Sequence, residues 1–240
     1  MERRELLFDG KEKQVYATDD PEKVIFRFKD VISAYDGIKR ATLADKGKTS
    51  TAFSSLIFEY LRDHGVRTHY IERVSEDEQL CHKICIIPIE VVVHNYIAGS
   101  IAEKLGLEEG VKPSCVIYDL RYNNDALGDP LINDTQAIAL GIATQEDLKT
   151  IYSTARRINT LLVKLFERAG LKLVDLKLEF GRAWNGEIIV SDEISPDTCR
   201  IWDAETDERL DKDRFRRDLG YIVAAYAKAY DRLLKVKRAA

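Results

Sequence analysis

A lysine and two carboxylates between residues 174 and 203 have a spacing suited to a metal–phosphate complex. Lys177 and Glu179 are two positions apart, so in a strand their side chains share one face. If Asn185-Gly186 is the whole of a tight turn, Glu179 lies directly opposite Asp192, with Cβ atoms about 5 Å apart. Carboxylates this close repel each other, and Mg²⁺, which binds carboxylate, phosphate and water oxygens, would remove the repulsion. We therefore predict a metal site at Glu179 and Asp192, with Lys177 placed to meet a phosphate or a reacting carboxylate.

Simpler arrangements of these residues stay open. The register of the hairpin could differ, or both acids could point into water on an exposed face of the sheet. Lys177 could serve only as an ion-pair partner of Asp175 or Glu179. The metal site is therefore a hypothesis that depends on the geometry of this hairpin.

The elements that would position these residues follow from the pattern of the segment. Apolar and polar residues alternate from Val174 to Phe180, which predicts a strand with one apolar face. Asn185-Gly186 favours a type I′ turn, because both residues tolerate a positive φ, and residues 187–192 form the predicted return strand. Beyond it, Arg200 could grip a phosphate or carboxylate bidentately, or pair with an aspartate at position 197 or 203.

Residues 6–28 predict short antiparallel strands separated by turns. Gly10, within one of these turns, lets backbone amides approach an anion, and Lys11 and Lys13 project to one side of the following strand. This arrangement suits a polyphosphate. Surface lysines beside a hairpin turn would look the same.

The middle of the chain predicts a helix followed by a buried strand. Thr49 or Ser50 could cap a helix that runs to about His64. The apolar run 84–93 predicts a buried strand interrupted by Pro88. We place the join between two domains here, at residues 1–87 and 88–240.

Two polar residues follow that strand. His94 comes at its end, where a histidine is usually structural and hydrogen-bonded, and Ser100 precedes a short helix that ends at Gly106. Ser100 could cradle an anion or simply cap the helix. Residues 107–134 are expected to be rich in loops, with a turn at Asp129-Pro130.

Two more helices are expected towards the C-terminus. Thr144 and Asp147 have the spacing of a capping box, at the start of a long amphipathic helix that ends at Gly170. Lys212 opens a final helix that reaches at least Arg232.

The composition is typical of a soluble globular protein. The 240 residues are 45% hydrophobic and 32% charged, and the net charge of −4 argues against a nucleic-acid-binding surface. No apolar run approaches the roughly 20 residues needed to cross a bilayer, and the N-terminus lacks the apolar segment of a signal peptide. The four cysteines have no C-x-x-C spacing, and Cys81, His82 and Cys85 lack a second cluster of zinc ligands. These features favour a reduced, cytoplasmic setting without contact to a membrane or nucleic acid.

With these segments side by side, the chain resembles the SAICAR synthetases (phosphoribosylaminoimidazole-succinocarboxamide synthases) of purine biosynthesis. The motifs that carry the resemblance run from about Leu6 to Leu234 and keep their order: LLFDGKEKQVY, IPIEVVVHNYIAGS, VDLKLEFG, SDEISPDTCRIWD and LDKDRFR. The resemblance implies an α+β fold related to ATP-grasp enzymes, with a small antiparallel N-terminal domain that clamps ATP against a larger C-terminal domain. It also implies a Mg²⁺-dependent ligase that joins the carboxylate of carboxyaminoimidazole ribonucleotide (CAIR) to the amine of L-aspartate, with release of ADP and phosphate. The family commonly forms a homodimer.

The resemblance also implies roles for individual residues. Gly10, Lys11 and Lys13 would cover the phosphates, with Lys11 and Lys177 as catalytic groups, and Glu179 and Asp192 would hold Mg²⁺. The rest of the ATP site would include Val15, Ile84 and Ile86, the last two within a stretch that offers backbone contacts to adenine. The residues implied near CAIR or aspartate are Asp36, Gly37, His94, Ser100, Asp129, Asp175, Lys177, Arg200 and Lys212.

The chain departs from the family pattern at two places. His94 stands where V-V-R-N has an arginine expected near the CAIR phosphate, and Ser50 ends the motif that is K-G-x-x-N in the family. These changes put the affinity for CAIR in question but leave the ATP and Mg²⁺ residues untouched. A related ATP-using enzyme for another small carboxylate, or a binding protein with weakened catalysis, are the alternative functions.

Overall fold

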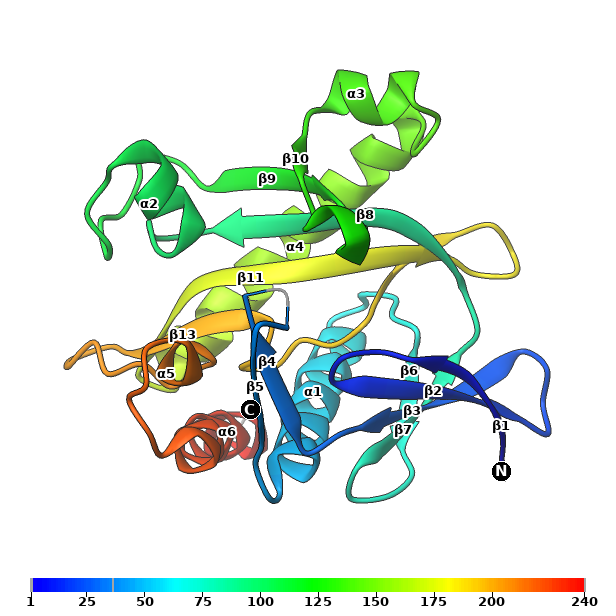
Figure 1. The fold of residues 1–240 in the computed structure, drawn as a ribbon, viewed down its shortest axis with the longest axis horizontal. Helices are drawn as coiled ribbons and strands as arrows, with labels where there is room; N and C mark the ends of the chain where they lie inside the picture. The colour runs from blue at the N-terminus through cyan, green and yellow to red at the C-terminus, as the bar shows by residue number, and fades with distance from the viewer. Residues whose placement is uncertain (1, 36, 240) are drawn as a thin grey trace.

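Two antiparallel sheets lie at the centre of the protein, in a computed structural model that describes residues 2–35 and 37–239 (Figure 1). The first is five-stranded, in the order β1-β2-β3-β7-β6. Its strands are β1 (Arg3–Asp9), β2 (Lys13–Thr18), β3 (Lys23–Phe28), β6 (Tyr70–Arg73) and β7 (Glu78–His82). The short antiparallel strands expected at the N-terminus are therefore confirmed. A separate two-stranded hairpin follows them, made of β4 (Val31–Ala34) and β5 (Lys39–Thr42).

The second sheet is six-stranded and carries most of the predicted site residues. Its order is β10-β9-β8-β11-β12, and β13 also pairs with β11. Its strands are β8 (Cys85–His94), β9 (Ile117–Tyr122), β10 (Leu131–Ile132), β11 (Leu171–Arg182), β12 (Ile188–Ser191) and β13 (Cys199–Asp203). The loop-rich region expected at 107–134 thus holds two strands that sequence reasoning missed. Pro88 does not interrupt β8, because it lies at a bulge in the β8–β11 ladder, where its missing N–H costs no regular hydrogen bond.

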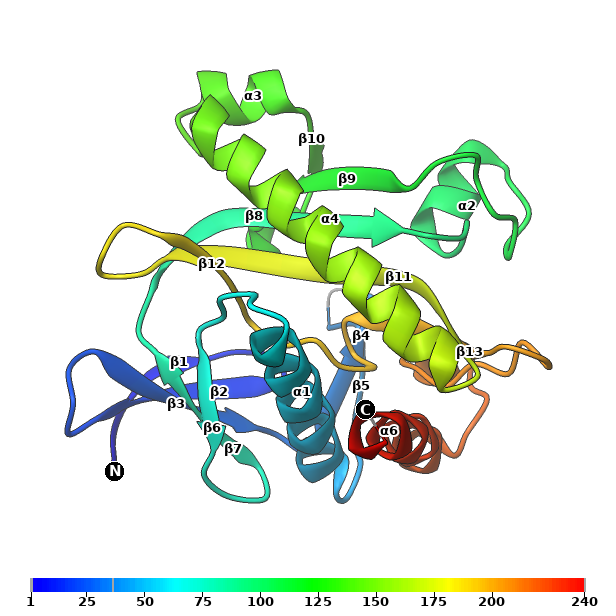
Figure 2. The same ribbon diagram turned by 180° about the vertical axis from the view of Figure 1, so that it is seen from behind.

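Three long helices pack against the sheets. The helix α4 (Gln145–Arg168) crosses one face of the six-stranded sheet, and α1 (Lys46–Asp63) lies between the first sheet and α6 (Ile222–Arg238) (Figure 2). The short elements are α2 (Ser100–Leu105), α3 (Asp134–Ala139), α5 (Asp213–Arg216) and a 3₁₀ turn at Asp125–Leu127. One buried apolar cluster joins α1, β8, α4 and β11 through side chains such as Phe53, Ile89, Ile158 and Leu176. This mixture of helices and antiparallel sheets is the expected α+β fold.

The helix ends show which local signals were sufficient. The capping box of Thr144 and Asp147 is present at the start of α4, as predicted. The helix α1 begins at Lys46, earlier than Thr49 or Ser50, because the chain turns sharply at Asp45, where φ is 63°. The single final helix predicted from Lys212 is wrong. The segment forms two helices, α5 and α6. The chain between them has a positive φ at Asp218, Gly220 and Tyr221, which a continuous helix does not allow.

The register predicted for the β11–β12 hairpin is also wrong by one residue. Glu179 pairs with Ser191, not with Asp192. The turn contains three residues rather than two, because the Ala183 N–H donates to the Glu187 carbonyl and only Gly186 has a positive φ. Trp184 lies in this turn and is 79% exposed, whereas Trp202 on β13 is only 5% exposed.

Candidate active site

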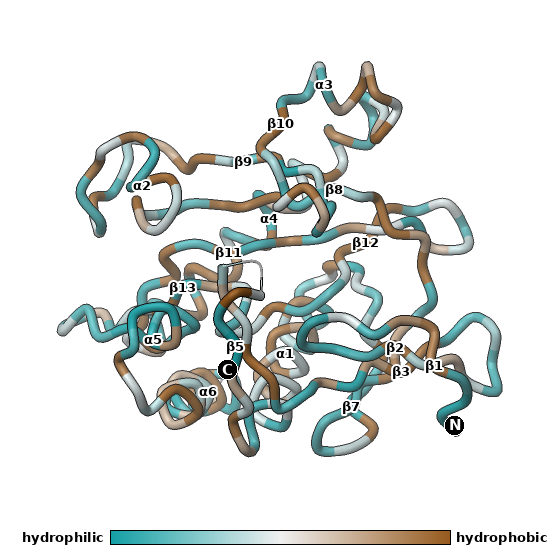
Figure 3. The backbone as a smooth tube through the Cα atoms, viewed as in Figure 1, coloured by the Kyte–Doolittle hydropathy of each residue, from teal (hydrophilic) through white to brown (hydrophobic). Residues whose placement is uncertain are grey.

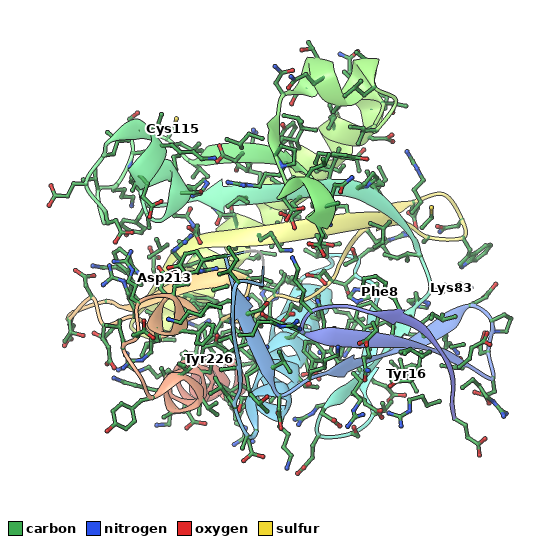
Figure 4. All side chains as sticks on the ribbon, viewed as in Figure 1. Phe8, Tyr16, Lys83, Cys115, Asp213 and Tyr226 are labelled. Carbon is green, nitrogen blue, oxygen red and sulfur yellow. The ribbon has the colours of Figure 1, made fainter. Side chains whose placement is uncertain are left out.

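Two neighbouring cavities gather the predicted site residues. The larger has a volume of about 720 Å³ and the smaller about 430 Å³, and both are lined by Lys177 and Asp129. Phe8 and Lys83 line the larger cavity and lie across the molecule from Asp213, which lines the smaller (Figure 4). The chain around α5, beside the smaller cavity, is mainly hydrophilic (Figure 3).

Every predicted site residue that the structure describes lines one of these cavities. The larger is lined by Gly10, Lys11, Lys13, Val15, Gly37, Ile84, Ile86, Asp129, Lys177, Glu179, Asp192 and Lys212. The smaller is lined by His94, Ser100, Asp129, Asp175, Lys177 and Arg200. Asp36 lies outside the described residues.

Lysines and carboxylates alternate where the two cavities meet. The Lys177 ammonium lies 2.6 Å from Glu179 Oε1 and 2.8 Å from Glu90 Oε1. The ion pair with Glu179 that was considered as an alternative role for Lys177 is thus present, and Glu90 rather than Asp175 is a second partner. Lys13 reaches across from β2 to form an ion pair with Asp192.

The backbone at Asp192 brings its side chain to this centre despite the shifted register. In a regular strand a one-residue shift would turn the side chain to the opposite face of the sheet. Asp192 follows the end of β12 and has a φ of 64°, a left-handed conformation that aspartate tolerates. The carboxylate consequently faces Lys13 and stays within 3.9 Å of the Lys177 ammonium.

The two carboxyl groups titrate far apart. Burial and the negative charge of Asp192 raise the pKa of Glu179 to about 7. Burial opposes ionisation of Asp192 as well, but the ammonium groups of Lys13 and Lys177 outweigh it and lower the pKa of Asp192 to about 2. The charge of Asp192 thus opposes ionisation of Glu179. A bound cation would remove this repulsion and allow both groups to ionise.

This donor set fits Mg²⁺ in a nucleotide site. The described residues contain no group of three or more His, Cys, Asp or Glu side chains that could hold a metal alone. Mg²⁺ in such sites takes only one or two carboxylates and completes its shell with phosphate oxygens and water. Glu179 and Asp192 supply these two carboxylates beside a cavity large enough for a nucleotide.

The turn between β1 and β2 brings Lys11 and Lys13 to different parts of the larger cavity. The Gly10 N–H donates to the Lys13 carbonyl at 2.8 Å, and a Cβ at Gly10 would lie 2.9 Å from the Phe8 ring. Lys11 forms an ion pair with Asp125 at 2.8 Å, whereas Lys13 projects towards Asp192. The two lysines therefore flank the cavity, as groups that neutralise a polyphosphate would.

Glu12, between these lysines, anchors the turn to the rest of the molecule. Its carboxylate lies 3.0 Å from the Lys46 ammonium and 2.6 Å from that of Lys212. Burial opposes ionisation of Glu12, but these two charges lower its pKa to about 2. Lys46 is fully buried and also lies 2.7 Å from Asp197.

Arg200 and His94, which line the smaller cavity, are each paired with carboxylates. Arg200 pairs with Asp175 at 2.7 Å and Asp213 at 3.0 Å, rather than with Asp197 or Asp203 as considered from the sequence.

His94 is 2% exposed and lies between Asp119 and Asp175, whose oxygens are 3.4 and 3.6 Å from its ring nitrogens. Burial would lower the pKa of His94, but the two carboxylates raise it to about 9.

Comparisons with known proteins agree with this geometry. A family model for SAICAR synthetase matches residues 6–233. The phosphoribosylaminoimidazole-succinocarboxamide synthase of Clostridium acetobutylicum is 49% identical over 97% of this chain and 99% of its own. The chain belongs to the SAICAR synthetase family. The family, the ligase class and the fold expected from the motifs are thereby confirmed.

Solved structures of SAICAR synthetases have the same fold as this chain. The synthase from Ehrlichia chaffeensis superposes with a TM-score of 0.94 at 39% identity, covering 95% of this chain and 98% of that one. A SAICAR synthetase in complex with ADP has a TM-score of 0.92 at 42% identity, covering 95% and 97%. Within the described residues, no helix has the length and apolar character needed to cross a membrane.

Several residues of this candidate site were missed by sequence reasoning. They are Glu12, Glu90, Asp119, Arg121, Glu193 and Asp197, all close to the predicted residues. Glu90 had a usable signal, since it is the only charged residue in the apolar run 84–93. Asp197 gave none, because an acid after Ser195-Pro196 is indistinguishable from a turn residue.

Proposed function

We propose that this SAICAR synthetase joins the carboxylate of CAIR to the amine of L-aspartate at the expense of ATP. The observation that carries the proposal is the centre of Lys13, Lys177, Glu179 and Asp192 at the meeting of two cavities. A nucleotide in the larger cavity and a carboxylate in the smaller would meet there. The complex of a 42% identical relative with ADP supports a nucleotide in this fold.

The chemistry explains why such a centre is needed. A carboxylate does not react with an amine directly, because the leaving group would be an oxide. Attack of a CAIR carboxylate oxygen on the γ-phosphorus of ATP breaks the bond to ADP and forms an acyl phosphate. The aspartate amine then attacks the acyl carbon, phosphate leaves, and the amine loses a proton to give the amide of SAICAR.

The residues of the larger cavity would bind and position ATP. Gly10, Lys11 and Lys13 would cover the phosphates, where lysine charge offsets the anionic oxygens. Val15, Ile84 and Ile86 line the apolar part of the cavity, which suits adenine. Glu179 and Asp192 would hold Mg²⁺, which neutralises phosphate charge when bound.

Lys177 would orient the reacting carboxylate, because its ammonium lies on the boundary between the two cavities. The residues assigned to CAIR are His94, Ser100, Asp175 and Arg200, in the smaller cavity. Gly37, Asp129 and Lys212 would lie near the aspartate or CAIR pocket, and Asp36 is assigned there from the family motif alone.

We also propose that residues 1–87 act as a clamp on ATP against residues 88–240. The residues facing the nucleotide cavity come from both parts, for example Lys13 and Asp192. A homodimer and a cytoplasmic location complete the proposal.

Release of ADP tests this function directly. With ATP, Mg²⁺, CAIR and aspartate present, we expect continuous ADP release and formation of SAICAR. Omission of CAIR should abolish release, and omission of aspartate should limit it to one equivalent per enzyme, the amount of acyl phosphate. Turnover with a different small carboxylate but not with CAIR, or nucleotide binding without any turnover, would overturn the proposal.

A further inference from the structure

Arg121 projects into the smaller cavity from β9 and has no role in the function proposed above. It lies opposite Glu90 in the β8–β9 ladder, one strand away from the lysine–carboxylate centre. One guanidinium nitrogen donates to Ser100 Oγ at 3.2 Å and another donates to the Asp129 carbonyl at 3.3 Å. Both partners are uncharged, so the positive charge of Arg121 is not neutralised by them.

The other cationic groups of this cavity are already paired with carboxylates. Arg200 is held by Asp175 and Asp213. Two further arginines each pair with an acid, Arg216 with Asp213 at 2.5 Å and Arg217 with Glu109 at 2.6 Å.

The imidazolium of His94, enclosed between Asp119 and Asp175, is balanced in the same way. Of the arginines and histidines lining this cavity in the described part of the chain, Arg121 alone has no carboxylate within ion-pair distance.

We propose that Arg121 is the principal cationic contact for the phosphate monoester of the ribonucleotide substrate, with the Ser100 hydroxyl beside it. This inference rests on the proposed function, since it assigns the phosphate end of CAIR to the smaller cavity. A guanidinium presents five N–H donors in a planar fork, and its geometry matches two phosphate oxygens at once. Arg121 uses only two contacts to neutral oxygens, so a dianion can approach without breaking an existing ion pair.

The assignment also explains how the chain tolerates a histidine at position 94. His94 is enclosed and its charge is shared between two acids, whereas Arg121 on the adjacent strand lies at Ser100. The phosphate contact is therefore supplied by β9 rather than by the end of β8.

The test compares CAIR with its dephosphorylated nucleoside as substrates, at saturating ATP and aspartate. In Arg121→Met we expect the KM for CAIR to rise about 10- to 100-fold, the range for loss of a charged hydrogen bond. The KM for the nucleoside, which lacks the phosphate, should stay within about twofold of the wild-type value, and kcat should change little. Arg121→Lys, which keeps the charge but loses the fork, should give an intermediate KM for CAIR.

Two controls make the result specific. Arg156→Met removes an exposed arginine on α4 and should leave both KM values unchanged. The Kd for ADP, measured on every variant, should match that of the wild type, because Arg121 does not line the larger cavity. If Arg121→Met fails this folding check, Arg121→Gln, which keeps donors for Ser100 and Asp129, takes its place.

The outcomes separate this inference from the proposed function. Equal KM changes for CAIR and the nucleoside, or no change for either, would overturn the assignment of Arg121. Failure of the wild-type enzyme to use CAIR would overturn the proposed function itself. Inorganic phosphate should also inhibit the wild type competitively against CAIR and inhibit Arg121→Met more weakly, and equal inhibition of both would again overturn the assignment.

Discussion

At the scale of single residues, two neighbouring carboxyl groups of the proposed active site have pKa values shifted in opposite directions. The pKa of Glu179 is raised to about 7 and that of Asp192 is lowered to about 2, although both side chains are partly buried beside Lys177. The difference arises because Lys13 and Lys177 stabilise one negative charge better than two. A divalent cation would allow both groups to ionise, which is the physical basis of the proposed Mg²⁺ site.

Neutral isosteres of the two acids test this site. We expect Glu179→Gln and Asp192→Asn each to lower kcat by about 100-fold or more, since each removes a charge that would hold Mg²⁺ against the phosphates. Both variants should still unfold cooperatively, because amides preserve the shape of the side chains. Asp192→Asn should be less stable than the wild type, because Lys13 and Lys177 lose the negative charge that they contact. Steady-state ADP release at several Mg²⁺ concentrations measures the effect, with Glu187→Gln on the same hairpin as control. Near-normal turnover of either variant at ordinary Mg²⁺ would count against the metal assignment.

His94 should make the free energy of unfolding depend on pH, because its pKa differs between the folded and unfolded protein. Its folded pKa of about 9 lies above the usual value of 6.5, so its ion pairs contribute full stability below pH 6.5, and this contribution is lost as the pH rises through 9. We expect His94→Asn to lower the free energy of unfolding at pH 6, and this deficit to shrink by about 3 kcal/mol at pH 9.5.

Urea unfolding at the two pH values measures this change, and the exposed His82→Asn is the matched control. A deficit that stays the same at both pH values would show that His94 acts by packing alone.

At the scale of secondary structure, a close approach of α1 to the end of β3 explains the position of Lys46. A Cβ on Gly47 would lie only 2.5 Å from the Phe28 carbonyl oxygen, and the Gly47 N–H donates to Asp30 at 2.9 Å. Because no side chain fits there, glycine allows α1 to begin at this point. The adjacent Lys46 can then reach both Glu12 and Asp197.

Substitution of this glycine should be costly. In an ordinary helix Gly→Ala stabilises by about 1 kcal/mol, but we expect Gly47→Ala to destabilise the protein by roughly 1–3 kcal/mol through overpacking. The KM for ATP should rise as well, because Lys46 holds Glu12 in the turn that we propose covers the phosphates. Unfolding and initial-rate measurements check both effects, with Lys48→Ala in the same helical turn as control. A stabilised Gly47→Ala variant would contradict the packing argument.

The elements differ in how far their sequence specifies them. The alternation of apolar and polar residues predicted β11, and the capping box predicted the start of α4, because both signals are local in sequence. The register of the hairpin could not be derived, since Asn185-Gly186 is compatible with a turn of two or of three residues. The direction of the Asp192 side chain could not be derived either, because a positive φ is allowed for aspartate but not required. The strand β9 was missed because its pairing with β8 is non-local. Most residues of the candidate site were predicted from family motifs. Glu12 and Arg121 could not be predicted, because most of their contacts are with residues distant in sequence.

At the scale of the whole molecule, one polar network connects the turn between β1 and β2 to the C-terminal helix. Glu12 contacts Lys46, Lys46 contacts Asp197, and Asp197 accepts a hydrogen bond of 2.8 Å from the Tyr226 hydroxyl. These residues are distant in sequence and come from the turn between β1 and β2, from α1, from the loop before β13 and from α6. Removing any one of them leaves its partners buried with fewer contacts.

Tyr226→Phe measures how strongly this network contributes to folding. Loss of a buried hydrogen bond to a carboxylate should lower the free energy of unfolding by about 2 kcal/mol. Circular dichroism in urea provides the measurement, and Tyr221→Phe, at a position that is 84% exposed, should have no effect. A Tyr226→Phe variant as stable as the wild type would show that Asp197 finds an equivalent partner.

The unequal exposure of the two tryptophans gives this enzyme an intrinsic optical reporter. Trp184 is exposed to water in the turn of its hairpin, so its emission in the folded protein should match that of a solvated indole. Trp202 is enclosed on β13 with the Arg209 guanidinium 5.0 Å from its ring. A red shift in fluorescence during denaturation would therefore come from Trp202 alone, and it would report when the edge of the large sheet separates from the core.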